Sequence, residues 1–291
     1  MPHGHTDVSP APSDLQRQIL SLVLRVGLFS LIVMMTLVLL PIALIPLVER
    51  FAGATLTVFG AGTIANAISY RIYERSNLMH AGLEWTVPAR RNLLIGIGLG
   101  TGFGLVIVLA IVALGQARIQ SAGPMSWPSL VFVSVVLMFG AVGEELMFRG
   151  YGFQLLAGKI GRFATLLPMA VLFGAAHIDN IASTPLSVIN TAVWGLLLGY
   201  ATLKSRGLWL AVGLHYGWNW ILPMLGAPLS GFKMGVTGLR LDSNENRWAG
   251  GGYGPEASLV LTLLLPGLFY LVHRLKVAPQ QALLLRGLDD D

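Results

Sequence analysis

Residues 26–48 read VGLFSLIVMMTLVLLPIALIPLV, a run without a charged side chain. A helix needs about 20 apolar residues to cross the ~30 Å hydrocarbon core of a bilayer, so this run predicts a membrane span. The run is longer than the ~7–15 apolar residues of a signal-peptide core, and no small-x-small cleavage site precedes Glu49 and Arg50. We therefore expect it to stay in the protein as the first span.

Further apolar runs bring the expected number of spans to about eight. These runs cover residues 51–69, 93–115, 128–148, 163–177, 186–203, 208–225 and 257–273. The run 51–69 is rich in glycine and can instead be an interfacial segment, and 163–177 is short for a span. With both termini in the cytoplasm, most of the 19 Lys and Arg fall on the cytoplasmic side, as the positive-inside rule requires. The sequence thus predicts an all-α, polytopic transmembrane helix bundle.

The composition agrees with a membrane protein. Hydrophobic residues make up 54% of the 291 residues and charged residues only 11%, with a mean hydropathy of +0.70, whereas soluble domains hold roughly 25% charged residues. The chain contains no cysteine, which excludes disulfides, thiol nucleophiles and thiolate metal sites. The net charge of +5 comes from Lys and Arg scattered between apolar runs, so nucleic acid is not an expected partner.

Ionisable and polar side chains occur together in three of the expected spans. They are Glu144, Glu145 and Arg149 near the end of the fourth span, His177 at the end of the fifth, and His215 and Asn219 in the seventh. A charged side chain at the centre of a membrane helix costs roughly 2.5–3.5 kcal/mol, so such groups need partners and often mark a reaction or transport path. The first three spans contain almost nothing comparable.

The two glutamates are expected to differ in role. Glu145 and Arg149 are four residues apart on one helix face and can pair, whereas Glu144 is turned about 100° away and stays available. If the helix continues through Gly150 to the next turn, Glu144 lies ~21 Å from that turn and His177 ~24 Å, at matching depth. A helix break at Gly150 or Gly152 would instead bring Glu144 nearer the cytoplasmic face, and the cluster could then form through a different turn.

The histidines and Asn219 are expected to face one cavity. His215 and Asn219 share a helix face, and Phe173 stands one turn before His177, over which it can pack. A lone histidine in a span is about as often an interhelical hydrogen-bonding group, and a glutamate pair at a helix end is commonly a solvated cap. The combination of a free glutamate, two histidines and an asparagine on three helices favours a functional site.

The ordered motifs EExxxR, FxxxH and HxxxN resemble the CPBP family of intramembrane proteases, also called the ABI family. This family includes type II CAAX prenyl endopeptidases and bacteriocin-processing or lysostaphin-resistance-like proteins. The resemblance covers residues 128–225 and implies a catalytic transmembrane core at 126–275. Before that core we expect a mobile tail at 1–20 and a transmembrane region at 21–125. After it we expect a tail at 276–291, in contact with the membrane surface.

The resemblance also implies a set of roles. Glu144 would activate water as general base, His177 and His215 would polarise or bind, and Asn219 would help to hold the oxyanion. Supporting positions would be Glu145, Arg149 and Phe173. The residues themselves leave the cofactor open, because Glu144, His177 and His215 can form a zinc site with an open water position or act without a metal.

The expected function is an intramembrane endopeptidase acting on a membrane-associated peptide or protein, in contact with the lipid bilayer. Two alternatives stay open, namely a proton-coupled membrane transporter and a catalytically inert immunity or scaffold protein of the same fold. The expected location is a bacterial plasma membrane with both termini cytoplasmic. The Gly-rich, polar loop 226–256 is expected to be a tolerated external loop, and a lid folded over the helices stays open as the alternative.

Overall fold

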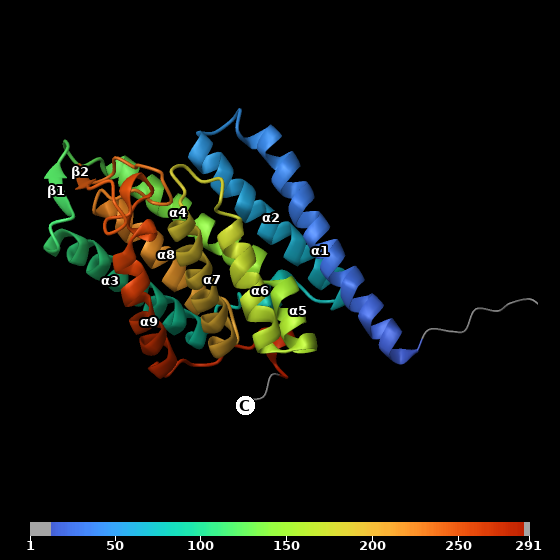
Figure 1. The fold of residues 1–291 in the computed structure, drawn as a ribbon. Helices are drawn as coiled ribbons and strands as arrows, with labels where there is room; N and C mark the ends of the chain where they lie inside the picture. Colours follow the sequence, from blue (N-terminus) through green and yellow to red (C-terminus); the bar gives the residue numbers. More distant parts are fainter. Residues whose placement is uncertain (1–12, 288–291) are drawn as a thin grey trace, which may run out of the picture.

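The computed structural model describes residues 13–287, and helices dominate them (Figure 1). The helices are α1 (Asp14–Leu44), α2 (Arg50–Tyr73), α3 (Val87–Ala113), α4 (Trp127–Arg149), α5 (Tyr151–Ile160), α6 (Arg162–Ala175), α7 (Pro185–Ser205), α8 (Trp209–Met224) and α9 (Leu259–Arg274). Two short antiparallel strands, β1 (Ala117–Ser121) and β2 (Leu239–Ser243), join the segment after α3 to the loop after α8. The expectation of an all-α bundle is confirmed.

Every apolar run predicted as a span lies largely within a helix, namely α1 to α4 and α6 to α9. Five helical segments among residues 13–287 are long and apolar enough to cross a membrane: Asp14–Leu44, Arg50–Tyr73, Val87–Ala113, Trp127–Ile160 and Pro185–Ser205. Helices α6 and α9 are apolar but shorter. The Gly-rich run 51–69 therefore belongs to a full-length candidate span. Residues 1–12 of the expected amino-terminal tail lie outside the described residues, and α1 already begins at Asp14.

Glycines allow two pairs of helices to approach closely. A Cβ atom on Gly143 of α4 would lie 2.5 Å from the Cα of Phe59 in α2. A Cβ on Gly100 of α3 would lie 2.2 Å from the carbonyl oxygen of Leu214 in α8. Small residues at helix contacts are typical of membrane bundles, where lipid supplies no hydrophobic force between helices. Because α4 and α8 also contact each other, the order α2, α4, α8, α3 runs across the bundle.

The fourth span breaks at Gly150, so the continuous helix used to estimate the depth of Glu144 is not present. Asn66 of α2 stabilises the break, since its side-chain nitrogen donates to the Leu146 carbonyl at 2.8 Å and its side-chain oxygen accepts from the Tyr151 N–H at 2.7 Å. A Cβ on Gly150 would lie 2.2 Å from that Asn66 oxygen. The chain then forms α5 and turns into α6, and the expected site residues still line one pocket.

The carboxy-terminal segment differs from the expected surface tail. The Gln280 N–H donates to the Ser205 carbonyl at 2.7 Å, and its side chain donates to the Gly82 carbonyl at 3.0 Å. Ala282 and Leu285 are completely buried. The segment up to residue 287 thus packs against the end of the bundle, because its side chains fill space between η1 (Leu78–Ala81), α5 and α7.

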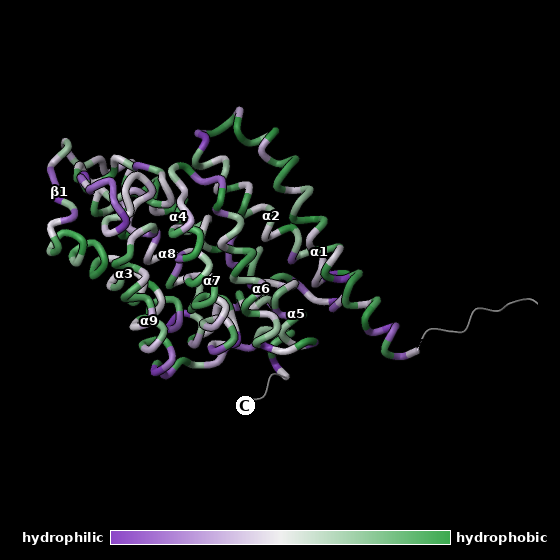
Figure 2. The backbone as a smooth tube through the Cα atoms, in the orientation of Figure 1, coloured by the Kyte–Doolittle hydropathy of each residue, from purple (hydrophilic) through white to green (hydrophobic). Residues whose placement is uncertain are grey.

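Many large apolar side chains of the bundle are exposed. Hydrophobic residues, coloured green, predominate along α1 (Figure 2). On α1, for example, Met34 and Val38 are 59% and 62% exposed. An exposed apolar surface of this extent suits contact with lipid rather than with water.

Candidate active site

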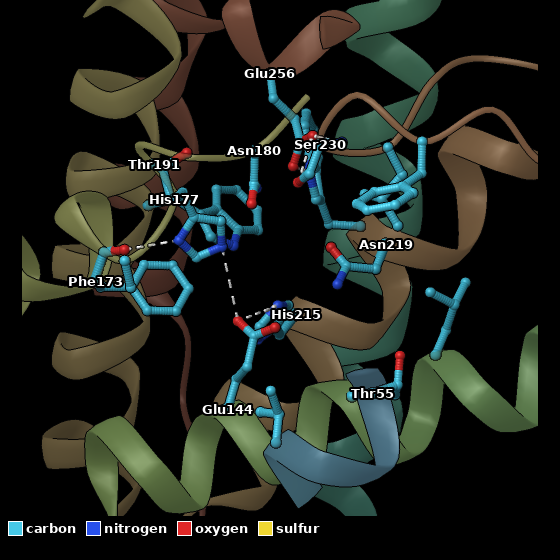
Figure 3. Close-up of a pocket in the computed structure, with 18 of the residues that line it drawn as sticks. Thr55, Glu144, Phe173, His177, Asn180, Thr191, His215, Asn219, Ser230 and Glu256 are labelled. Carbon is cyan, nitrogen blue, oxygen red and sulfur yellow. Dashed lines mark hydrogen bonds and ion pairs between the residues drawn. The ribbon is translucent and has the colours of Figure 1, made fainter. Parts of the chain in front are cut away.

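One pocket brings together the four residues expected to act in chemistry, Glu144, His177, His215 and Asn219 (Figure 3). The pocket has a volume of about 270 Å³. Its walls come from α2, α4, α6 and the turn after it, α7, α8, the loop between α8 and α9, and the start of α9; His177 lies in the turn, two residues beyond the end of α6. Residues distant in the sequence therefore share one concave, partly polar space inside a largely apolar bundle.

The carboxylate of Glu144 faces both imidazoles. Its Oε2 atom lies 4.0 Å from the Nε2 of His177 and 3.8 Å from the Nε2 of His215. The same oxygen is buried and has no hydrogen-bond partner among the described residues. Both separations exceed the length of a direct hydrogen bond.

Hydrogen bonds at Nδ1 orient the rings of both His177 and His215. The Nδ1 of His177 lies 2.8 Å from the carbonyl oxygen of Phe173, and the Nδ1 of His215 lies 2.8 Å from Oε1 of Glu145. A carbonyl and a carboxylate only accept hydrogen bonds, so each Nδ1 carries a hydrogen and donates it. Phe173 also packs on the His177 ring, with the two ring centroids 4.9 Å apart. Each histidine is thus held with its Nε2 directed at Glu144.

Glu145 lies behind the pocket and is completely buried. Its Oε1 accepts from Nη1 of Arg149 at 3.2 Å as well as from His215. The guanidinium of Arg149 also donates to the carbonyl of Gly195 at 2.8 Å and lies 4.3 Å from the ring centroid of Phe173. The neighbouring glutamates therefore occupy different surroundings, with Glu144 in the pocket and Glu145 within an arginine–histidine chain.

Asn219 lies in the pocket wall one turn after His215. In the described part of the chain, no hydrogen bond joins Asn219 to Glu144, His177 or His215, so its amide is available to a molecule in the pocket. Figure 3 places this amide between Glu144 and Ser230.

The long loop contributes residues that the sequence did not single out. Leu229, Ser230, Phe232 and Glu256 all line the pocket, so this external loop forms part of its wall. Strand β2 within this loop pairs with β1, which holds the loop over the bundle. Burial raises the pKa of the Glu256 carboxyl, although hydrogen bonds from Ser230 and Trp218 oppose this effect. A single glutamate in a Gly-rich loop carries no periodic signal, because its partners are distant in the sequence.

The side chains allow a test of the zinc site that the sequence left open. Two imidazole nitrogens and a carboxylate oxygen are suitable zinc ligands. Among residues 13–287, however, no group of three or more His, Cys, Asp or Glu side chains is arranged to hold a metal ion. The roles proposed for Glu144, His177 and His215 are those of the side chains themselves.

The fold defines an integral membrane protein of the all-α, polytopic class. Residues 126–221 match the model of the Rce1-like family, described as type II CAAX prenyl endopeptidase Rce1-like. The matched segment includes all three motifs that resemble the CPBP family, so the match confirms that resemblance and supports protease activity in general. Comparison with curated proteins and with solved structures gives no match.

Proposed function

We propose that the protein is an intramembrane endopeptidase that hydrolyses a peptide bond of a membrane-associated peptide or protein. The observation that carries the proposal is the approach of Glu144 Oε2 to two imidazole Nε2 atoms, at 3.8 and 4.0 Å, within one pocket of a membrane-spanning bundle. The Rce1-like match over residues 126–221 agrees with a membrane-associated protein substrate. We further propose that both termini face the cytoplasm.

In the proposed reaction Glu144 acts as the general base. A water molecule hydrogen-bonded to its Oε2 loses a proton to the carboxylate while the water oxygen attacks the carbonyl carbon of the scissile peptide bond. The carbonyl oxygen becomes an oxyanion in the tetrahedral intermediate. When the C–N bond breaks, Glu144 returns the proton to the leaving nitrogen, so the carboxylate is regenerated.

The oxyanion needs hydrogen-bond donors that are already in position. The amide NH₂ of Asn219 is one such donor, and it lies on the helix that also carries His215. His177 and His215 polarise the carbonyl in the imidazolium form, in which Nε2 as well as Nδ1 carries a hydrogen and Nε2 donates to the carbonyl oxygen. Losing one preorganised donor of this kind typically lowers kcat about 10²–10³-fold.

The remaining residues of the site position these groups. Glu145 fixes the ring of His215, the Phe173 carbonyl fixes the ring of His177, and Arg149 balances the buried charge of Glu145. Phe173 additionally separates the Arg149 guanidinium from the His177 ring by packing against both.

The proposal is tested with the purified protein in lipid nanodiscs and a library of membrane-associated peptides. Glu144→Gln keeps the size of the side chain but removes the base, so we expect cleavage to fall by about 10²–10⁴-fold. Glu84→Gln is the matched control, because Glu84 pairs with His80 outside the pocket. Wild-type cleavage by a correctly folded Glu144→Gln variant would exclude the proposed reaction.

A parallel measurement with a metal chelator tests the side-chain mechanism. We expect chelator to leave the cleavage rate unchanged. Activity that is lost with chelator and restored by zinc would overturn the metal-free mechanism, while the proposed peptidase function would remain.

A further inference from the structure

Glu256, in the short turn η3 (Pro255–Ala257), joins three parts of the pocket. Its backbone carbonyl accepts from the side chain of Asn190 in α7 at 2.9 Å. Its carboxylate accepts from Nε1 of Trp218 in α8 at 3.3 Å and from Oγ of Ser230 at 3.0 Å. The backbone N–H of Ser230 donates to the same carboxylate oxygen. One side chain thereby connects α8 with a distant turn of the long loop.

That turn, residues 229–232, has a backbone conformation that needs support. Leu229 and Phe232 exchange backbone hydrogen bonds of 2.9 and 2.8 Å, and the two central residues, Ser230 and Gly231, have φ angles of +49° and +86°. Two positive φ angles are typical of a type I′ turn, in which glycine is favoured and serine carries a steric cost. Both donors of Ser230 bind Glu256, so the carboxylate stabilises the residue that the turn itself disfavours.

The turn forms the pocket wall on the far side from Glu144. Figure 3 shows Glu256 and Ser230 across the cavity from Glu144. The ring of Phe232 contacts Phe51 at the start of α2, with centroids 5.7 Å apart, so the turn also closes the gap towards α2. A substrate bound beside Glu144 therefore lies beneath this turn.

Trp218 links this wall to the helix of the proposed oxyanion donor. It stands one residue before Asn219 and is only 2% exposed. Its ring packs on the ring of Trp194, with the centroids 5.0 Å apart, and its Nε1–H donates to the carboxylate of Glu256. The position of the turn and the position of α8 are thus coupled through one carboxylate.

We propose that Glu256 is a positioning residue that fixes the turn 229–232 against α8 and so shapes the substrate-binding wall opposite Glu144. The effect on hydrolysis rests on the proposed peptidase function, whereas the effect on the wall does not. Loss of Glu256 removes the hydrogen bonds that its carboxylate accepts from Ser230 and Trp218, and the wall then opens. This change weakens substrate binding more than it slows the chemical step.

The wall is tested by the reactivity of a thiol placed inside the pocket. The chain has no cysteine, so Thr191→Cys, a pocket-lining position that is 9% exposed, introduces the only thiol. In this background we expect Glu256→Ala to raise the rate of labelling by a water-soluble maleimide at least about tenfold, because several hydrogen bonds to one charged group are lost. Glu245→Ala is the matched control, since Glu245 lies in the same loop and binds only the Gly252 N–H in the described interactions.

Two further variants keep this test decisive if Glu256→Ala does not fold. Glu256→Gln retains an acceptor oxygen and should give a labelling rate between those of the parent and the alanine variant. Ser230→Ala removes one donor to the carboxylate and should raise labelling by severalfold. Labelling rates equal to that of the Glu245→Ala control in every folded variant would overturn the proposal.

A kinetic measurement separates positioning from catalysis. We expect Glu256→Ala to raise KM about tenfold while kcat stays within about threefold, the pattern of lost ground-state binding. A fall in kcat with unchanged KM would contradict a positioning role. If no peptide is cleaved by the wild type, the peptidase proposal fails, and the labelling rates still decide whether Glu256 holds the wall.

Discussion

Replacing Arg149 by methionine removes the cation that accompanies the buried carboxylate of Glu145. Arg149 is 1% exposed, and its guanidinium lies 3.2 Å from Glu145 Oε1 and 2.8 Å from the Gly195 carbonyl oxygen. Methionine keeps much of the packing volume but supplies no charge. Removing one partner of a buried ion pair leaves the other charge uncompensated, so we expect the free energy of unfolding to fall by about 3–5 kcal/mol.

The assay is thermal or denaturant unfolding in nanodiscs, followed by tryptophan fluorescence. Glu145→Gln added to Arg149→Met removes the orphaned charge and retains an oxygen for the Nδ1 hydrogen of His215, so the double variant should be more stable than Arg149→Met alone. Arg240→Met is the control, because Arg240 is exposed and should change stability by less than about 0.5 kcal/mol. Wild-type stability of Arg149→Met, or a double variant weaker than the single one, would refute this reasoning.

Two other predictions concern helix packing and pH. Gly143→Ala places a Cβ 2.5 Å from the Cα of Phe59, so overpacking should lower the free energy of unfolding by about 1–3 kcal/mol. In the control Gly98→Ala the new Cβ meets nothing within 4 Å, so that variant should be neutral or stabilising. Equal melting temperatures of the two variants would contradict this prediction. Burial raises the pKa of Glu256 above 4.5, so the folded protein binds that proton more tightly than the unfolded chain does. The free energy of unfolding should therefore decline as pH rises from about 4.5 through the raised pKa, and Glu256→Gln should flatten this decline. The same dependence of melting temperature on pH in both proteins would disprove the prediction.

The helices were predictable because a membrane span is encoded locally. An apolar run near 20 residues specifies a helix without reference to the rest of the chain, and this held even for the Gly-rich run that became α2. The break at Gly150 was not decided by the sequence, because its stabilising partner, Asn66, lies on another helix. The buried position of Gln280 likewise depends on contacts with Ser205 and Gly82.

The candidate site shows the same division between local and distant information. The four-residue spacing predicted that Glu145 and Arg149 can pair, and their atoms lie 3.2 Å apart. The spacing contained no information on the second bond of Glu145, to His215, because that distance depends on how α4 packs on α8. Glu256 was missed for a related reason, since all its side-chain donors come from segments distant in the sequence.

The matched segment 126–221 does not by itself enclose the pocket. It supplies Glu144 and the residues that face it, while Phe51 and Thr55 of α2 form one further wall and the turn at Ser230 with Glu256 forms another. A cavity of about 270 Å³ leaves a bound peptide little room to avoid either wall. Under the proposed function, the chemical groups come from α4, α8 and the turn after α6, and we propose that α2 and the loop between α8 and α9 select the substrate. The same pocket that holds Glu144 is lined by residues of α2 and of the loop, which lie outside the matched segment.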